Sequence, residues 1–227
     1  MVALTMNQSL AFNKHEREAI YRVIAERRDV RRGFVNTPLP EDLLGRLLTA
    51  AHSAPSVGLM QPTRFIVIRE YSIRKAVHTI FEAANSQAKE AYRGEREETY
   101  SNLKLEGILE APQNLCVLCD LESNRGHGLG RQTIPETVVY STVCAIQNLW
   151  LAARSEGVGV GWVSILDPLK LREVLCIPER LKLVAYLCLG YVEGFSSEPD
   201  LERFGWETRV DLNKVVSYER YSEAGLP

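Results

Sequence analysis

The segment from Glu136 to Ser155 constrains the fold more than any other, because it is apolar nearly all round a helix. Apolar residues recur at helical spacing on one face and continue on a second, as Val139, Val143, Ile146, Trp150 and Ala153, then Ala145, Leu149 and Ala152. Such a helix must be covered on most of its faces, in a core or a subunit interface. Gly157 follows as a C-capping glycine. We therefore expect a central helix and an obligate homodimer.

Four apolar segments predict the strands of a sheet. Arg64–Ile68 and Leu115–Cys119 are short continuous apolar runs, and Leu181–Tyr191 is a longer one. Val160–Ile165 follows the central helix and delivers Ser164 near its end. We expect Arg64–Ile68 to be a central strand, because nearly all of its residues are apolar.

Further segments predict helices around this sheet. Asn13 and Glu16 form a capping box before an apolar stripe of Ala19, Ile20, Val23 and Ile24, which predicts a helix to Glu26. Other helices are expected from Glu41 to about Ser53, from Tyr71 to about Glu110 with an interruption at Gly94, and briefly after Asp167-Pro168. No repeat or low-complexity linker divides the chain, so we expect a single domain over residues 1–227.

The composition argues against several classes of function. A net charge of −2 disfavours nucleic-acid binding, which needs a basic face. No apolar run approaches the roughly 18 residues of a membrane span, and the first 13 residues lack signal-peptide features, so we expect a cytoplasmic protein with no membrane partner. Five cysteines, an odd number, indicate reduced thiols. Cys116 and Cys119 should point to opposite faces of their strand, so we expect no metal site.

Residues 27–33, Arg-Arg-Asp-Val-Arg-Arg-Gly, place four arginines around one aspartate. Guanidinium groups this close repel one another unless an anion lies among them, and their forks match phosphate oxygens. A solvated basic turn is the alternative. Asp29 should stay ionised among these cations, available to accept a proton or to orient a donor.

Two further segments are candidates for parts of a site. Residues 54–62 hold two prolines, a glycine and a serine, which predicts a loop of defined shape beside a strand. Residues 86–100 are rich in charge and poor in apolar side chains, which predicts a lid within about residues 86–110, a dimer-spanning arm, or a solvated helix. Glycines 157, 159 and 161 lack the strand–glycine–helix order of a dinucleotide fingerprint.

Four motifs in sequence order resemble the nitroreductase family of FMN enzymes over nearly the whole chain. They are Arg27-Arg28-Asp29-Val30-Arg31, Ala54-Pro55-Ser56 with Gln61-Pro62, Gly157-Val158-Gly159 before Gly161-Trp162, and Leu187-Cys188-Leu189-Gly190-Tyr191. The resemblance implies an α+β homodimer, with a mixed, mainly antiparallel central sheet flanked by helices and with FMN at the subunit interface. It also implies the FMN-binding residues: Arg27, Arg28 and Arg31 at the phosphate, Ser56, Met60, Gln61 and Pro62 under the ring and ribityl chain, Gly161 and Trp162 beside the ring, and Arg209 as a second phosphate contact.

Asp29 departs from the usual family pattern, which has serine between the arginines. Together with Met60 and the sequence Gly161-Trp162-Val163-Ser164, it resembles a branch of the family that destroys FMN. In that branch reduced FMN is the substrate, dioxygen is the co-substrate and a separate flavin reductase supplies FMNH2. The products are 5,6-dimethylbenzimidazole, the lower ligand of vitamin B12, and erythrose 4-phosphate. The resemblance implies that Asp29 acts as a base and that Ser164 positions an intermediate.

Two alternatives stay open on the sequence. An NAD(P)H-dependent nitro- or quinone reductase uses the same fold, and needs an open face above the flavin where nicotinamide can stack. A protein that stores or senses flavin without turnover would use the same binding residues.

Overall fold

The computed structural model describes residues 11–221. Its helices and strands are α1 (Lys14–Glu26), α2 (Glu41–His52), β1 (Thr63–Ile68), α3 (Tyr71–Lys89), α4 (Glu95–Asn102), β2 (Gln113–Asp120), α5 (Thr137–Ser155), β3 (Val158–Val163), α6 (Pro168–Val174), β4 (Leu181–Tyr191) and α7 (Asp200–Arg203). The predicted capping box is confirmed at α1, where Asn13 and Glu16 each accept the other's backbone N–H. Asp167 caps α6 in a similar way.

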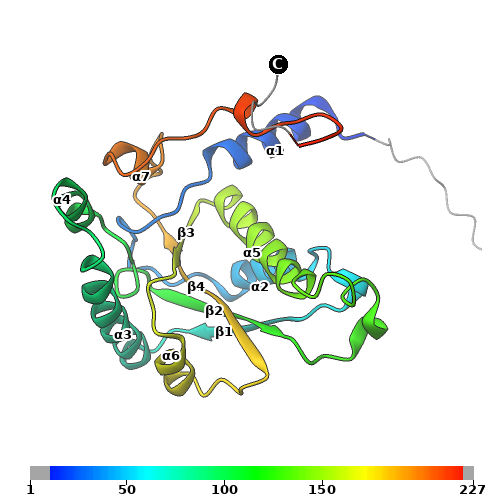
Figure 1. Ribbon diagram of the computed structural model, residues 1–227, viewed down its shortest axis with the longest axis horizontal. Coiled ribbons are helices and arrows are strands. Elements are labelled where there is room, and N and C mark those ends of the chain that lie inside the picture. The colour runs from blue at the N-terminus through cyan, green and yellow to red at the C-terminus, as the bar shows by residue number, and fades with distance from the viewer. Residues whose placement is uncertain (1–10, 222–227) are drawn as a thin grey trace, which may run out of the picture.

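The four strands form one antiparallel sheet in the order β1-β2-β4-β3 (Figure 1). A parallel bridge between Asp29 and Val160 adds a short mixed element at the β3 edge. The expected α+β architecture is confirmed. The prediction that Arg64–Ile68 is a central strand was wrong, because β1 lies at the edge of the sheet. An apolar run marks burial but not position, and Val67 in β1 is 37% exposed.

Helices cover both faces of the sheet, and each face has its own core. On one face α2 and α5 pack through residues such as Leu47, Ile146 and Leu149 against alternate residues of β2, β3 and β4. On the other face α3 and α6 pack through Val77 and Leu171. The strand β2 is buried along its whole length because it lies between two strands and two helix layers. Among residues 11–221, no helix is long and apolar enough to cross a membrane.

The helix α5 is less completely covered than its sequence predicts. Its buried residues include Val138, Ala145 and Trp150, but Tyr140 is 56% exposed and Val143 is 40% exposed. The outer face of α5, defined here by Tyr140, Val143, Cys144 and Gln147, is exposed and has no cover among residues 11–221.

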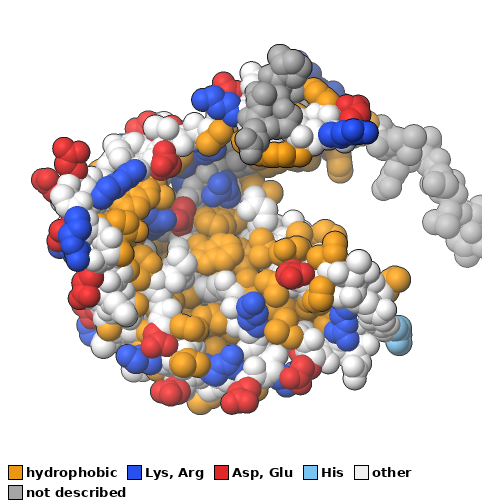
Figure 2. Space-filling model, in the orientation of Figure 1, with side chains coloured by type: hydrophobic (Ala, Val, Ile, Leu, Met, Phe, Trp, Pro, Cys, Tyr) orange, Lys and Arg blue, Asp and Glu red, His pale blue; other side chains and the backbone are white. Residues whose placement is uncertain are grey.

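The helix α1 stands away from the body of the protein. None of its residues is buried, although Ile20 and Ile24 belong to the predicted apolar stripe. Figure 2 shows a wide hollow between the arm, which comprises α1 and residues 207–221, and the surface over α5. The predicted apolar stripe of α1 is therefore left uncovered by the part of the chain that the structure describes.

The helix predicted from Tyr71 to about Glu110 ends earlier than expected. Gly94, with φ +59°, separates α3 from α4, and residues 103–110 are not helical, so the last part of that prediction was wrong. Tertiary contacts explain the difference. Arg74 donates to the carbonyl oxygens of Ile108, Leu109 and Ala111, which therefore need no helical partners.

Candidate active site

The arginine segment, defined here as residues 27–33, runs along the outer edge of β3. The N–H of Val30 donates to the carbonyl oxygen of Val160 at 2.9 Å. Gly161 allows this approach, because a Cβ atom at that position would lie 2.0 Å from the carbonyl oxygen of Val30. The glycine of the Gly161-Trp162 motif is therefore required by backbone packing beneath the site.

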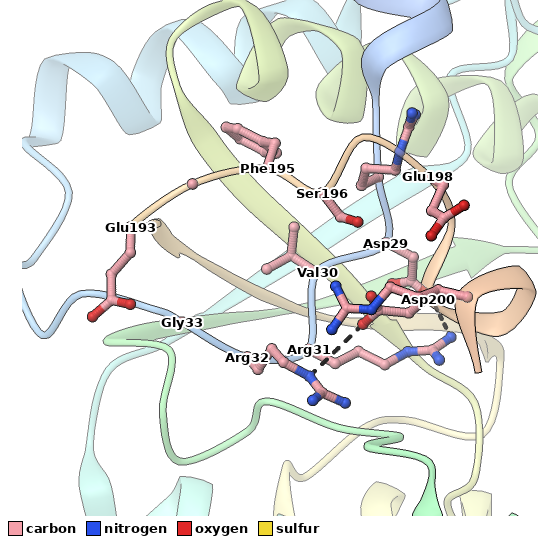
Figure 3. A pocket seen from close by; sticks show the side chains of 13 residues that line it. Asp29, Val30, Arg31, Arg32, Gly33, Glu193, Phe195, Ser196, Glu198 and Asp200 are labelled. Carbon is pink, nitrogen blue, oxygen red and sulfur yellow. Dashed lines mark hydrogen bonds and ion pairs between the residues drawn. The ribbon is translucent and has the colours of Figure 1, made fainter. Parts of the chain in front are cut away.

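Asp29 is held in one orientation by two different donors. Its Oδ1 accepts the backbone N–H of Trp162 at 2.9 Å, and its Oδ2 forms an ion pair with Arg31. The Asp29 side chain is 29% exposed and that of Arg31 is 13% exposed. Both line a cavity of about 310 Å³ closed on its far side by residues 193–200 (Figure 3). Two donors fix the carboxylate while one side of it faces open space.

Arg27 and Arg209 come together from opposite ends of the chain. Both line a second cavity of about 600 Å³, beside Gln147 of α5 and the carboxylates of Glu198 and Glu202. Burial lowers the pKa of Arg27, and the like charges of Arg28 and Arg209 lower it further against the opposite effect of Asp29. Neither the Arg27 nor the Arg209 guanidinium forms an ion pair within the part of the chain that the structure describes. Two unpaired, mutually repelling guanidinium groups on one cavity fit an anion such as phosphate.

Arg28 has different contacts from its two neighbours in the motif. Its guanidinium donates to the carbonyl oxygens of Ala25 and Arg27, both at 2.8 Å, and to that of Ser197. It thereby ties residues 193–209, which we call the C-terminal strap, to the arginine segment. The Nε atoms of Arg28 and Arg31 are buried with no partner among residues 11–221, so this region has donor capacity left over for a ligand.

The loop from Ser56 to Pro62 has a shape fixed by hydrogen bonds, as its sequence predicts. The Ser56 hydroxyl accepts the N–H of Gln61 at 3.0 Å, and Met60 is buried beneath the loop. Gln61 has φ +49°, so its backbone adopts a left-handed conformation that the surrounding contacts must stabilise. The carbonyl oxygen of Pro62 accepts the N–H of Asp120, which fixes the loop to the end of β2.

One chain does not bring this loop to the arginine segment. The loop precedes β1 at one edge of the sheet, whereas the arginine segment lies beyond β3 at the other edge, about 19 Å away across four strand spacings. The two parts also contact different turns of α5. The N–H of Val57 donates to the Ser141 hydroxyl at 3.0 Å, and the indole N–H of Trp150 donates to the carbonyl oxygen of Arg28 at 3.1 Å. The predicted site residues therefore form two separate groups within a chain.

The family model described as "Nitroreductase family" matches residues 24–191. The chain belongs to the nitroreductase family. A protein of Rhodospirillum rubrum named 5,6-dimethylbenzimidazole synthase is 44% identical over 198 residues, which cover 87% of this chain and 93% of the relative. A protein of the same name from Rhodobacter capsulatus is 42% identical over 199 residues, with 88% and 96% covered.

Solved structures support the same fold at lower identity. Iodotyrosine deiodinase bound to FMN and 3-iodo-L-tyrosine has a TM-score of 0.71 at 22% identity, covering 89% of this chain and 100% of that chain. The NADPH:FMN oxidoreductase of Vibrio harveyi complexed with NAD+ has a TM-score of 0.65 at 18% identity, with 90% and 79% covered. At such identities the likeness establishes the fold, and the nitroreductase fold is confirmed.

The second predicted catalytic residue, Ser164, lies at the same edge of the sheet as Asp29. It directly follows β3, two residues after Trp162, which corresponds to about 7 Å along an extended chain. The Ser164 side chain is exposed, and its carbonyl oxygen accepts the N–H of Leu166 in a tight turn. A hydroxyl here is free to contact a molecule lying along β3.

Trp150 is a site residue that the sequence assigned only to the apolar stripe of α5. Besides its bond to Arg28, its ring lies 4.9 Å from the Arg27 guanidinium and 6.3 Å from the Trp162 ring. The residue type could have predicted the contact with Arg28, since a buried tryptophan needs an acceptor for its indole N–H. No local pattern in the sequence predicted the contacts of the C-terminal strap, because these contacts depend on the path that the chain takes after β4.

The two cysteines of β2 are buried and belong to different parts of the core. Within residues 11–221, no cluster of three or more His, Cys, Asp or Glu side chains could hold a metal ion. Cys116 and Cys119 belong to cores on opposite faces of the sheet, as predicted from the alternation of a strand. Burial raises the pKa of the Cys116 thiol to about 12 and also raises that of Cys119, so neither is a ready nucleophile.

Proposed function

We propose that this protein uses dioxygen to fragment reduced FMN, forming 5,6-dimethylbenzimidazole and releasing erythrose 4-phosphate. The observation that carries the proposal is the Asp29 carboxylate, held between Arg31 and the N–H of Trp162 at the side of a cavity. The names of the two bacterial relatives support the same product. Reduced FMN is then a substrate, and a separate flavin reductase must supply it.

The residues present fit FMN. Arg27 and Arg209 line the cavity suited to its phosphate group, and the Nε of Arg31 is buried without a partner among residues 11–221. Gly161 and Trp162 would lie beside the ring, on the strand whose outer edge is paired with Asp29 and Val30. Ser56, Met60, Gln61 and Pro62 contribute from the other group, at the opposite edge of the sheet.

A homodimer would complete such a site. The Ser56–Pro62 loop of one subunit and the arginine segment of its partner would meet if the α5 helices packed across a twofold axis. The outer face of α5 and the uncovered stripe of α1 supply apolar surface for that contact. We therefore propose FMN at the subunit interface, in a single-domain protein whose free cysteines suit the reducing cytoplasm.

Asp29 and Ser164 have separate roles in this proposal. Cleavage of the bond between C1′ and C2′ of the ribityl chain requires a base that removes a proton from a hydroxyl group or a carbon atom of that chain. The open side of the Asp29 carboxylate can accept this proton. Ser164 would hydrogen-bond the reacting molecule from the end of β3. Residues 86–110 would form a lid, because fragments must be retained and water kept out during the reaction.

The substitution Asp29→Asn tests the assignment of the base. The amide keeps an acceptor for the N–H of Trp162 but removes the proton-accepting charge. We expect FMN affinity to change little and formation of 5,6-dimethylbenzimidazole to fall by about 10²-fold or more, the usual contribution of a general base. Product is measured by chromatography after FMNH2 and air are supplied. Arg31→Gln is compared with it: this variant breaks the same ion pair but keeps the carboxylate, so product should still form at saturating FMNH2, although KM should rise because Arg31 is also a proposed phosphate contact. Wild-type turnover by Asp29→Asn would remove Asp29 from the mechanism.

A nitroreductase activity is the second candidate, because a Thermus thermophilus relative named NADH dehydrogenase is 28% identical over 219 residues. Exposure of the protein with FMNH2 to air separates the possibilities. A reductase returns intact FMN, a flavin-binding protein only delays oxidation, and the proposed enzyme loses the flavin chromophore. NADPH alone should reduce the bound FMN poorly if a lid covers the ring.

A further inference from the structure

An aromatic cluster joins the predicted lid to the C-terminal strap. The ring of Trp206 lies 5.2 Å from that of Tyr92 and 6.0 Å from that of Tyr100, with both pairs in edge-on geometry. Tyr92 and Tyr100 stack on each other at 4.8 Å, across the Gly94 break between α3 and α4. The charge-rich segment is therefore attached to the C-terminal strap through Trp206.

A charged contact strengthens the same attachment. The guanidinium of Arg96 in α4 lies 5.0 Å from the centre of the Trp206 ring and donates to the Trp206 carbonyl oxygen. The N–H of Trp206 donates to the carbonyl oxygen of Leu201 at 2.8 Å, which anchors the residue to the end of α7. In the structure α4 and α7 lie next to each other at one side of the molecule (Figure 1).

Trp206 and Arg209 are three residues apart on the strap. An extended chain covers about 10 Å in that distance, so a displacement of one residue is readily passed to the other. Arg209 lines the cavity with Arg27 and has no ion pair among the described residues. An anion bound between Arg27 and Arg209 would fix the end of the segment that carries Trp206.

We infer that the segment Trp206–Arg209 couples occupancy of the phosphate cavity to closure of α4. Trp206 is then a positioning residue: its contacts with Tyr92, Tyr100 and Arg96 hold α4 against the strap, and they become more stable when Arg209 engages the phosphate of the flavin. The inference rests on the flavin site of the proposed function. If this coupling exists, the protein should prefer phosphorylated flavin in kcat as well as in affinity. The reason is that binding energy from the remote phosphate is used to close the site. A purely structural Trp206 would support α4 equally with or without phosphate.

Hydrogen exchange of residues 92–102, read by mass spectrometry, tests the coupling without any reaction. The full-length protein is compared alone, with oxidised FMN, with riboflavin, and with riboflavin plus inorganic phosphate. We expect FMN to slow exchange several-fold, riboflavin at saturation to leave it nearly unchanged, and added phosphate to restore part of the protection. Equal protection by FMN and riboflavin would overturn the inference.

Variants of Trp206 identify the residue responsible. In Trp206→Ala the FMN-dependent change in exchange should be lost although FMN still binds, whereas Trp206→Phe should retain most of it. Tyr218→Ala is the control, since Tyr218 is another aromatic residue of the tail, 67% exposed and outside the cluster. A Trp206→Ala protein that keeps the full FMN-dependent protection would refute the role of Trp206. Because the flavin is oxidised, this outcome does not depend on whether reduced FMN is fragmented.

Turnover provides a second readout for the same variants. For the wild-type protein, kcat for consumption of reduced FMN should exceed that for reduced riboflavin by roughly tenfold or more. In Trp206→Ala the kcat with FMN should fall to the riboflavin level while KM for FMN changes less. An unchanged ratio of the two kcat values in the variant would contradict the coupling, even if both flavins are consumed.

Discussion

Replacing Gly161 with alanine tests whether the close approach of the arginine segment to β3 builds the site. The new Cβ atom would lie 2.0 Å from the carbonyl oxygen of Val30, far inside van der Waals contact. That oxygen belongs to the backbone and cannot rotate away. The arginine segment must therefore move from β3, which weakens two hydrogen bonds of 2.9 Å: Val30 N–H to Val160, and Trp162 N–H to Asp29.

The cost of that movement follows from its parts. Overpacking costs about 1–3 kcal/mol, and each weakened hydrogen bond adds about 1 kcal/mol, more for the one to a carboxylate. Because such contributions overlap, we expect a loss of about 3 kcal/mol in the free energy of unfolding. For a chain of this size that lowers Tm by about 6–12 °C. Product formation should be lost as well, since Asp29 no longer faces the same cavity.

The assay is thermal unfolding at one fixed protein concentration, with and without FMN. Gly45→Ala is the matched control, because Gly45 is exposed within α2 and a Cβ atom there meets nothing within 4 Å. That change should raise stability by up to about 1 kcal/mol through lower backbone entropy in the unfolded chain. If Gly161→Ala unfolds within about 2 °C of wild type and still forms product, the packing argument is wrong.

Two further predictions follow from other parts of the fold. A homodimer that covers the outer face of α5 should leave Cys176 reactive toward a thiol reagent and protect Cys144, whereas a monomer should react at both, because these are the two exposed cysteines. Val143→Asp, which places a charge on that face, should restore labelling of Cys144 and yield a monomer in sedimentation. Arg74→Met should lower the free energy of unfolding by about 2 kcal/mol in urea titrations, because buried carbonyl groups lose their donor. An unchanged urea midpoint for Arg74→Met would mean that those carbonyl groups find other partners.

Local signals in the sequence were sufficient for most elements. The capping box at Asn13, the cap at Asp167 and the glycine after α5 all act within a few residues, so each identifies a helix end without reference to the rest of the chain. The long apolar run of β4 begins and ends as predicted, at Leu181 and Tyr191. The motifs around Asp29 and Gly161 also indicated the family, which the comparisons confirm.

Contacts between residues far apart in the sequence decided the features that local signals did not determine. Asp29 meets the N–H of Trp162 across 133 residues of sequence, and no periodicity or cap records such a contact. The same limit explains the misplaced β1, since an apolar run is compatible with a central or an edge position until neighbouring strands are chosen. It also explains the short α4, where the turn after it is set by Arg74, a residue of another helix.

The sequence by itself determined most of the elements, the family and the residue types available for a flavin site, because caps, periodicity and motifs are local properties. Only the tertiary structure decided that Arg27 and Arg209 share a cavity, that Arg28 binds the strap through Ser197, and that the Ser56–Pro62 loop lies at the far edge of the sheet. These arrangements depend on which strands pair and where the chain returns after β4, and such choices are made by burial and hydrogen bonding over the whole fold.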